Sequence, residues 1–234
     1  MLLVVCLCAA QIAARAQQAD TVFLVPPASP GSDHSVFIVP ERGRAEMYRR
    51  LADFSLTADD SAALRDAGLL VRADRMPAKR KAALAPLRGL PGAWLPLCYH
   101  AGQYYLYDPC DEGANRKMQL RPGLLLVWFM DGPSPDLVMS GACLSPDTYR
   151  LNTAADAAGN GAMQRLIHLV PSMPGVAVWE DPQAAPDERY RLYVSRDAAK
   201  NYPIITNRCT EMKADEYEFE TPPFAELLSR KKQN

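Results

Sequence analysis

The chain has 234 residues, of which 48% are hydrophobic and 23% are charged, and its formal net charge is −1. This apolar fraction is sufficient for a hydrophobic core. The balanced charge excludes intrinsic disorder and a surface basic enough to hold nucleic acid or an anionic membrane. The chain also contains 20 prolines, more than the usual share of about 5%. So many prolines argue against long helices and favour short strands joined by turns.

The N-terminus carries features of a secretory signal peptide. An apolar run over residues 2–10 precedes Ala14-Arg15-Ala16, which matches the A-x-A pattern of a cleavage site. The run is shorter than the ~20 apolar residues needed to cross a bilayer, and no Lys or Arg precedes it. We therefore expect residues 1–16 to be removed near Ala16 on export to the periplasm or the exterior. Residues 17–234 are then expected to form a single β-rich domain without a transmembrane segment. The alternative is a buried N-terminal strand or helix of a cytoplasmic protein.

Two short apolar runs, at residues 22–25 and 36–39, open the remaining chain and are separated by a loop rich in Pro, Ser and Gly. They predict strands on either side of a turn. Residues 41–88 then change character, because apolar side chains recur there at helical spacing. Thr57 begins a second helix with a capping-box pattern, and Gly68 ends it. Pro77 begins a third helix.

The helical segment is basic, whereas the chain that follows it is acidic. Residues 40–90 hold 11 basic and 7 acidic residues, a net charge of +4. Residues 91–234 hold 14 basic and 18 acidic residues, a net charge of −4. This asymmetry indicates either a basic face that binds an anionic partner or helices packed against an acidic sheet of the same chain. Acidic residues are interleaved among the basic ones, which favours the second interpretation.

From residue 94 onward the pattern is typical of β-structure and begins with a hairpin. Residues 94–100 and 103–108 flank Ala101-Gly102, which predicts a two-residue turn. In the register that this turn sets, two residues face each other across the hairpin when their numbers add up to 203. The side chains on one face are Leu95, Leu97, Tyr99, Tyr104 and Leu106, and those on the other are Trp94, Cys98, Tyr105 and Tyr107. Since both faces are apolar or aromatic, we expect both to be covered.

The remaining strands set the predicted fold. Residues 124–130 are a continuous apolar run bounded by turn residues, which predicts a buried central strand. Further strands are predicted at residues 137–143, 164–170, 176–180, 189–195, 204–209 and 217–221, and a short helix at residues 224–232. The predicted fold is α+β, a mostly antiparallel β-sheet with a short helical segment near residues 41–88. A β-sandwich or barrel with a helical insertion is the alternative architecture.

Four cysteines remain after removal of residues 1–16: Cys98, Cys110, Cys143 and Cys209. An even number in an exported chain predicts two disulfides, whereas four free thiols would fit a reducing compartment. In the hairpin register Cys98 faces Tyr105 and Cys110 faces Ala93, so these two cysteines lie too far apart to bond each other. Cys98 and Cys110 are therefore expected to pair with Cys143 and Cys209, in either order.

No local motif marks a catalytic or metal site. The sequence lacks a P-loop, HExxH, EF-hand loop, G-x-S-x-G and C-x-x-C, and no metal or cofactor is predicted. His100, beside the hairpin turn, is the first candidate for a general acid or base. His168 lies in an apolar strand pattern, which favours a structural role. The oxygen-rich residues 108–115 fit a solvated turn better than a Ca²⁺ loop.

Aromatic residues on the predicted strands supply the remaining functional signal. A sheet face or cleft with Trp94, Tyr105 and Tyr107 is a candidate surface for a sugar or a small apolar ligand, although core packing explains such residues as well. The sequence thus favours a non-catalytic protein that binds a small molecule or a protein partner, and no nucleic acid. The alternative is an exported hydrolase whose site is assembled from residues distant in sequence.

Overall fold

A computed structural model of the protein describes residues 21–29, 34–69, 76–111, 115–129, 132–154, 162–209 and 215–229. The signal peptide expected at residues 1–16 lies outside these ranges. So do the central residues 112–114 of the oxygen-rich segment and the end of the predicted C-terminal helix beyond residue 229.

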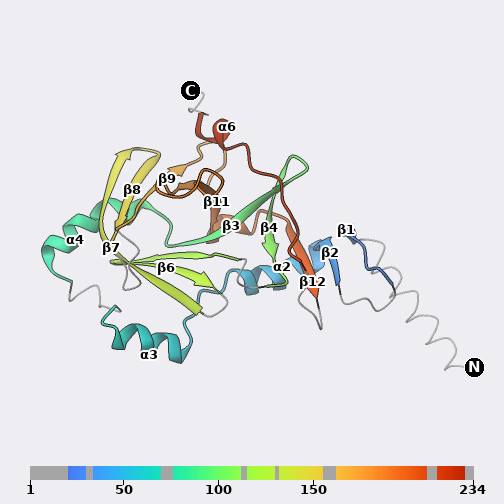
Figure 1. Ribbon diagram of the computed structural model, residues 1–234, viewed down its shortest axis with the longest axis horizontal. Coiled ribbons are helices and arrows are strands. Elements are labelled where there is room, and N and C mark those ends of the chain that lie inside the picture. The colour runs from blue at the N-terminus through green and yellow to red at the C-terminus, as the bar shows by residue number, and fades with distance from the viewer. Residues whose placement is uncertain are drawn as a thin grey trace, which may run out of the picture.

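In these described ranges twelve strands form one sheet, and almost all of its pairings are antiparallel (Figure 1). The strands are β1 (Val22–Val25), β2 (His34–Ile38), β3 (Ala93–His100), β4 (Gln103–Asp108), β5 (Met118–Arg121), β6 (Leu124–Phe129), β7 (Gly132–Ser145), β8 (Thr148–Thr153), β9 (Gln164–Leu169), β10 (Val176–Glu180), β11 (Tyr190–Ser195) and β12 (Ile204–Cys209). The helices are α2 (Glu41–Leu51), α3 (Ala58–Asp66), α4 (Ala78–Leu84), the 3₁₀ helix η2 (Ala85–Gly89), α5 (Arg196–Ala199) and α6 (Phe224–Ser229). The predicted fold class is confirmed, with the sheet closed into a barrel.

Eight of the strands form this closed barrel. They follow one another in the order β3-β11-β10-β9-β8-β7-β6-β5, and a pairing between β3 and β5 closes the circle. Strand β3 belongs to two layers, because residues 93–96 pair within the barrel and residues 97–100 pair with β4. Beyond β4 the sheet continues through β12, β2 and β1, on the right of Figure 1.

Apolar side chains fill the barrel. Each of its eight strands contributes to one buried cluster: Trp94, Met118, Leu125, Val127, Val138, Leu151, Ile167, Ala177, Trp179 and Tyr193. An eight-stranded barrel has an interior just wide enough to be filled in this way. Leu87 and Leu90 join the same cluster from η2 and its end, so η2 closes one end of the barrel. The other end is the mouth described below.

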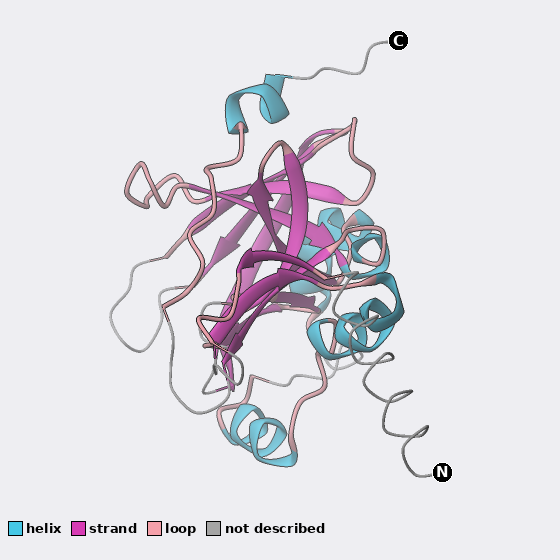
Figure 2. Ribbon diagram, turned by 90° about the vertical axis from the view of Figure 1, so that its right-hand side faces the viewer, coloured by secondary structure: helices cyan, strands magenta, loops and turns pink. Residues whose placement is uncertain are grey.

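The helices cover the outside of the strands. In Figure 2, α6 lies at the top, α3 at the bottom, and the other helices lie to the right of the strands. Leu64 of α3 packs on Leu124 and Leu126, which face away from the barrel interior. This contact explains why residues 124–127 are apolar at every position and confirms the predicted buried strand. None of the described helices is long and apolar enough to cross a membrane.

Several local predictions are confirmed. The β3–β4 hairpin has the expected register, with Leu97 opposite Leu106 and Cys98 opposite Tyr105. Its turn residues both have positive φ, as a two-residue type I′ turn requires. Thr57 and the side chain of Asp60 form a reciprocal capping box at the start of α3.

The predicted set of strands needs three corrections. Strands β5 and β8 were not predicted, although their sequences Met-Gln-Leu-Arg and Thr-Tyr-Arg-Leu-Asn-Thr alternate as half-buried strands do. Residues 217–221 form no strand, and Glu220 makes only an isolated bridge to Tyr99. This segment instead packs Tyr217 and Phe219 over Tyr105 and Tyr107, covering the outer face of the hairpin.

One of the two predicted disulfides forms. Cys110 and Cys209 are bonded, with their Cα atoms 5.7 Å apart, because β12 runs parallel to β4 and ends beside it. Cys98 and Cys143 are free thiols, so the second predicted bond is wrong. Strand β7, which carries Cys143, lies at least three strand positions from β3 around the barrel. At about 4.8 Å per strand this exceeds the ~7 Å limit for a disulfide.

Candidate functional site

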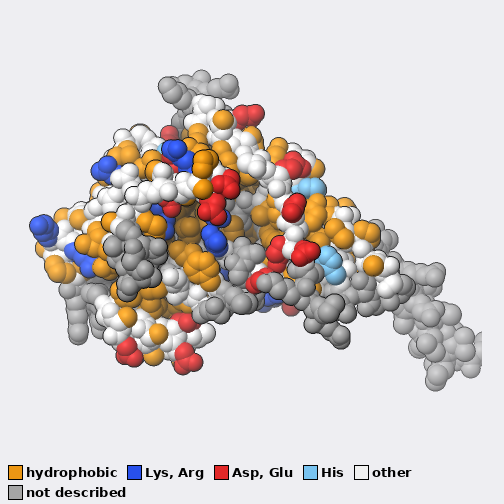
Figure 3. Space-filling view, viewed as in Figure 1, with side chains coloured by type: hydrophobic (Ala, Val, Ile, Leu, Met, Phe, Trp, Pro, Cys, Tyr) orange, Lys and Arg blue, Asp and Glu red, His pale blue; other side chains and the backbone are white. Residues whose placement is uncertain are grey.

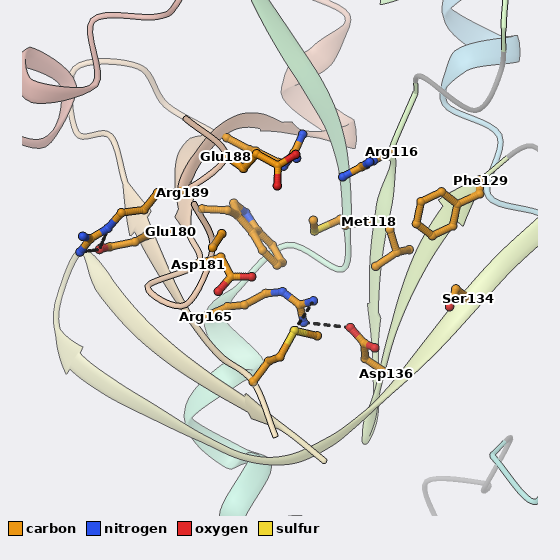
Figure 4. A pocket seen from close by; sticks show the side chains of 15 residues that line it. Arg116, Met118, Phe129, Ser134, Asp136, Arg165, Glu180, Asp181, Glu188 and Arg189 are labelled. Atoms are coloured by element: carbon orange, nitrogen blue, oxygen red, sulfur yellow. Dashed lines mark hydrogen bonds and ion pairs between the residues drawn. The ribbon is translucent and has the colours of Figure 1, made fainter. Parts of the chain in front are cut away.

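A cavity of about 310 Å³ opens at the mouth of the barrel (Figure 4). Its walls come from the starts of β7, β9 and β11, from the ends of β6 and β10, and from the residues before β5. Met118, Val127 and Trp179 form its buried side, and Phe129 stands at the rim, 40% exposed. The volume lies at the lower end of the range for ligand pockets, about 300–1,000 Å³. The site is therefore suited to a small molecule.

The inward-facing rows of the barrel change from apolar to charged at this mouth. Side chains two positions apart on a strand share a face. Arg165 accordingly precedes the core residue Ile167, and Arg191 precedes Tyr193. In the same way, Arg116 lies two positions before Met118, Asp136 two positions before Val138, and Asp181 two positions after Trp179. The barrel thus ends in a ring of charged side chains over an apolar floor.

One ion pair lies within this ring, and a second lies beside it on the wall of the cavity. Arg165 Nη1 lies 2.9 Å from Asp136 Oδ2, and both side chains are largely buried, at 12% and 16% exposure. Arg189 donates to Glu180 Oε1 through Nε at 2.9 Å and also through Nη2. In Figure 4 the Arg189–Glu180 pair lies at the left edge, whereas Arg165, Asp136 and Asp181 point toward the middle of the pocket.

Glu180 is held in its charged form. Burial alone would raise the pKa of Glu180, but the hydrogen bonds from Arg189 and from His168 Nε2, at 2.9 Å, keep it below its usual value. The same carboxylate raises the pKa of Arg189. Glu180 and Arg189 thus form a charged pair on the wall of the site.

Donors without acceptors remain at the mouth. Trp179 is 3% exposed, and its Nε1–H has no hydrogen-bond partner in the part of the chain that the structure describes. Arg116 and Arg191 form no ion pair with any described carboxylate. The backbone of Arg116 is positioned by the buried Tyr193, whose hydroxyl donates to the Arg116 carbonyl oxygen at 3.2 Å and whose pKa burial raises to about 12. The arrangement therefore offers hydrogen-bond donors and positive charge to a ligand oxygen.

Not every charge at the mouth is positive. Asp181 and Glu188 also line the cavity, and Asp181 Oδ1 accepts a hydrogen bond from the Gln183 backbone N–H in its own turn. Figure 3 shows the same mixture over the barrel, where acidic and basic side chains lie close together among hydrophobic ones near the middle of the face. The site thus suits a ligand with one anionic or carbonyl group rather than a highly charged one.

The structure places His100 away from this site. His100 Nδ1 lies 3.7 Å from Glu220 Oε1, beyond hydrogen-bond distance, and Glu220 instead accepts the backbone N–H of Ala101 at 2.9 Å. The imidazole packs near the rings of Tyr105 and Tyr217, and it does not line the cavity at the mouth.

The three aromatic candidates are not brought together. Trp94 is fully buried inside the barrel, where its ring contacts Trp179 and its Nε1–H donates to the Pro91 carbonyl oxygen at 2.8 Å. Tyr105 and Tyr107 are buried in a separate cluster outside the barrel. All three side chains pack in the core, as the alternative interpretation of these residues expected.

His168 lies between a hydroxyl group and a carboxylate, as a catalytic base does. Thr148 Oγ1 lies 3.5 Å from His168 Nδ1, and His168 Nε2 lies 2.9 Å from Glu180 Oε2. Thr148 and His168 do not line the cavity at the mouth, and the distance between them is long for a hydrogen bond. The His168–Glu180 pair is explained by its structural role between β9 and β10.

Among the described residues, no group of three or more His, Cys, Asp or Glu side chains is placed to hold a metal ion. Asp108, the first residue of the oxygen-rich segment, forms an ion pair with Arg50 of α2. That contact holds the helix against the end of β4.

Comparisons of the chain with family models, with curated proteins and with solved structures found no match. Function is therefore inferred from the geometry of the site.

The charged residues of the mouth were not singled out from the sequence. Their signal was present, because each stands two positions from a large apolar residue in an alternating strand, as in Arg165-Leu166-Ile167 and Arg191-Leu192-Tyr193. The alternation shows that the charged residue shares a face with the core residue. It does not show that five such strands meet at the same opening, because that can be known only from the order of the strands around the barrel.

Proposed function

We propose that this protein is an exported, non-catalytic binding protein that holds a small carboxylate-bearing molecule in the mouth of its barrel. The main support for this proposal is the buried Nε1–H of Trp179 on the cavity wall, which has no hydrogen-bond partner among the described residues. A buried donor without an acceptor costs about 1–3 kcal/mol, and a ligand oxygen placed against it removes that cost.

The charges around Trp179 support an anionic group on the ligand. Asp136 and Glu180 are already paired with arginines, whereas the guanidinium groups of Arg116 and Arg191 are not held by a described carboxylate. A planar guanidinium binds a carboxylate through two parallel hydrogen bonds. The apolar part of the ligand then packs on Met118, Val127 and Phe129.

The disulfide supports export. Cys110–Cys209 joins residues far apart in the sequence, and such bonds persist mainly in oxidising compartments. The apolar run and the triplet ending at Ala16 are consistent with this location. N-terminal sequencing of the exported protein is expected to find Gln17 first, and an intact Met1 on a cytoplasmic product would contradict export.

The two buried tryptophans of the barrel provide a matched test of binding. Isothermal titration calorimetry with phenylacetate is expected to show one site, with weaker binding of the uncharged phenylacetamide. Trp179→Phe keeps an aromatic ring but removes the unpartnered donor, and it should weaken phenylacetate binding by roughly tenfold. Trp94→Phe removes a donor that already has its acceptor, and it should leave affinity unchanged.

Two results would oppose the proposal. Equal affinities for the acid and the amide, or equal effects of the two substitutions, would show that the mouth does not select a carboxylate. Hydrolysis of an ester probe such as p-nitrophenyl acetate, abolished by His168→Gln, would instead favour a hydrolase built on Thr148, His168 and Glu180.

A further inference from the structure

A second cavity, of about 350 Å³, lies at the opposite end of the barrel. It is enclosed by α4, η2, the turn between β5 and β6, and the middle of β7. Its wall is mostly apolar: Met76, Leu84, Leu87, Leu90, Leu120 and Val138. Four of these side chains are buried, so the cavity reaches from the surface to the edge of the barrel core.

The polar side chains at this cavity are all basic. Lys81 comes from α4, Arg88 from η2 and Arg121 from the end of β5, and none of the described lining residues is acidic. Arg121 Nε donates to Gln119 Oε1 at 2.9 Å, which orients its guanidinium. In Figure 3, basic side chains stand beside hydrophobic ones at the left end of the molecule, over α4.

The wall of this cavity is held in place by close contacts. Arg80 Nη2 lies 3.4 Å from both the Gly123 and the Val138 carbonyl oxygens and so joins α4 to the β5–β6 turn and to β7. Gly123 has φ of +78°, and a Cβ there would stand 2.9 Å from Met76 Cε. The positive φ favours glycine at this turn, and the turn packs directly against the end of the Met76 side chain. The cavity is framed by packed elements rather than by a single loop.

This composition differs from that of the mouth, where arginines and carboxylates are mixed. An apolar wall whose described polar side chains are basic is complementary to an apolar chain that ends in a negative charge. The volume, at the lower end of the range for ligand pockets, suits one chain rather than two. We propose that this cavity binds a free, medium-chain carboxylate, with its chain against Leu84, Leu87 and Leu120 and its carboxylate at Arg88 and Arg121.

Calorimetry on the full chain with decanoate, below its micellar concentration, tests this site. We expect one decanoate to bind, and decanol, which has the same chain without the charge, to bind roughly tenfold more weakly. The double variant Arg88→Gln/Arg121→Gln should reduce decanoate affinity to that of decanol. Arg65→Gln/Lys79→Gln removes two cations that do not line the cavity and should leave affinity unchanged. Circular dichroism checks that each variant is folded.

A third variant separates this site from the mouth. Trp179→Phe should not alter decanoate binding, because Trp179 lines the cavity at the mouth and does not line the second cavity. Loss of decanoate binding in Trp179→Phe would place the chain in the mouth and overturn the second site. Absence of decanoate binding, or unchanged affinity in Arg88→Gln/Arg121→Gln, would overturn it as well, whatever the result with phenylacetate.

Discussion

The backbone of Gly141 on β7 lies directly against the side chain of Leu87 on η2. A Cβ atom at position 141 would stand 2.7 Å from Leu87 Cδ1 and closer still to the other two branch atoms. Leu87 is 6% exposed and belongs to the cluster that fills the barrel. The glycine thus provides the space through which η2 closes the barrel.

Replacement of this glycine should therefore destabilise the protein. We expect Gly141→Ala to lower the free energy of unfolding by about 1–3 kcal/mol, because the methyl group overlaps Leu87. Gly43→Ala, at a half-buried position of α2 where a Cβ would stand 3.4 Å from Val39 Cγ1, should be neutral or stabilising. Urea unfolding measures both changes.

A double-mutant cycle tests the contact itself. Leu87→Ala removes the overlapping atoms and should cost about 2–5 kcal/mol as a buried leucine. In that background Gly141→Ala should cost much less than in the wild-type protein. Strict additivity of the two substitutions would show that Leu87 does not pack on Gly141.

The Cys110–Cys209 bond should contribute substantially to stability. It closes a loop with a sequence separation of 99, and a bond of this kind stabilises a protein by about 2–4 kcal/mol. We expect Cys110→Ser/Cys209→Ser, or reduction of the wild-type protein, to lower the urea midpoint to a similar value. Cys143→Ser is the control, since its exposed thiol forms no disulfide. A wild-type midpoint unaffected by reductant would contradict the bond.

The two free thiols should differ strongly in reactivity. Burial raises the pKa of Cys98 to about 12, whereas Cys143 is exposed. Since the thiolate is the reactive species, iodoacetamide at pH 8 should modify Cys143 faster than Cys98 by roughly a hundredfold or more. Peptide mass spectrometry of the native protein follows both sites, and denaturation should equalise them. Equal native rates would show that the β3–β4 hairpin is not covered as the structure has it.

The hairpin illustrates what the sequence alone determines. Ala101-Gly102 fixes a two-residue turn, the turn fixes the register, and the register places Cys98 opposite Tyr105. The capping box at Thr57 and the glycine at position 68 bound α3 for equally local reasons. Interactions between residues close in the sequence are therefore predictable from it.

The site depends on interactions that are not local. Arg116, Arg165 and Arg191 meet only because β5, β9 and β11 begin at one opening of a closed barrel. Closure requires β3 to pair with β5, and β5 is too short to be recognised with ease. For the same reason the sequence could not decide between partners for Cys98, because the distance from β3 to β7 is set by the order of the strands.

Glu180 should make the stability of the protein depend on pH. Its pKa in the folded protein lies below the usual 4.5, because hydrogen bonds from Arg189 and His168 outweigh the effect of burial. A carboxyl group with a lowered pKa stabilises the fold above its unfolded pKa, and this contribution is lost as the pH falls through the folded value. We expect Glu180→Gln to lower the free energy of unfolding by about 1–2 kcal/mol at pH 7, and this difference should shrink below about pH 4.

Glu188→Gln, which neutralises an exposed carboxylate nearby, should show no such trend. Urea unfolding of the three proteins from pH 3 to pH 7 measures the differences, and a constant gap between wild type and Glu180→Gln across that range would show that Glu180 is not held in its charged form.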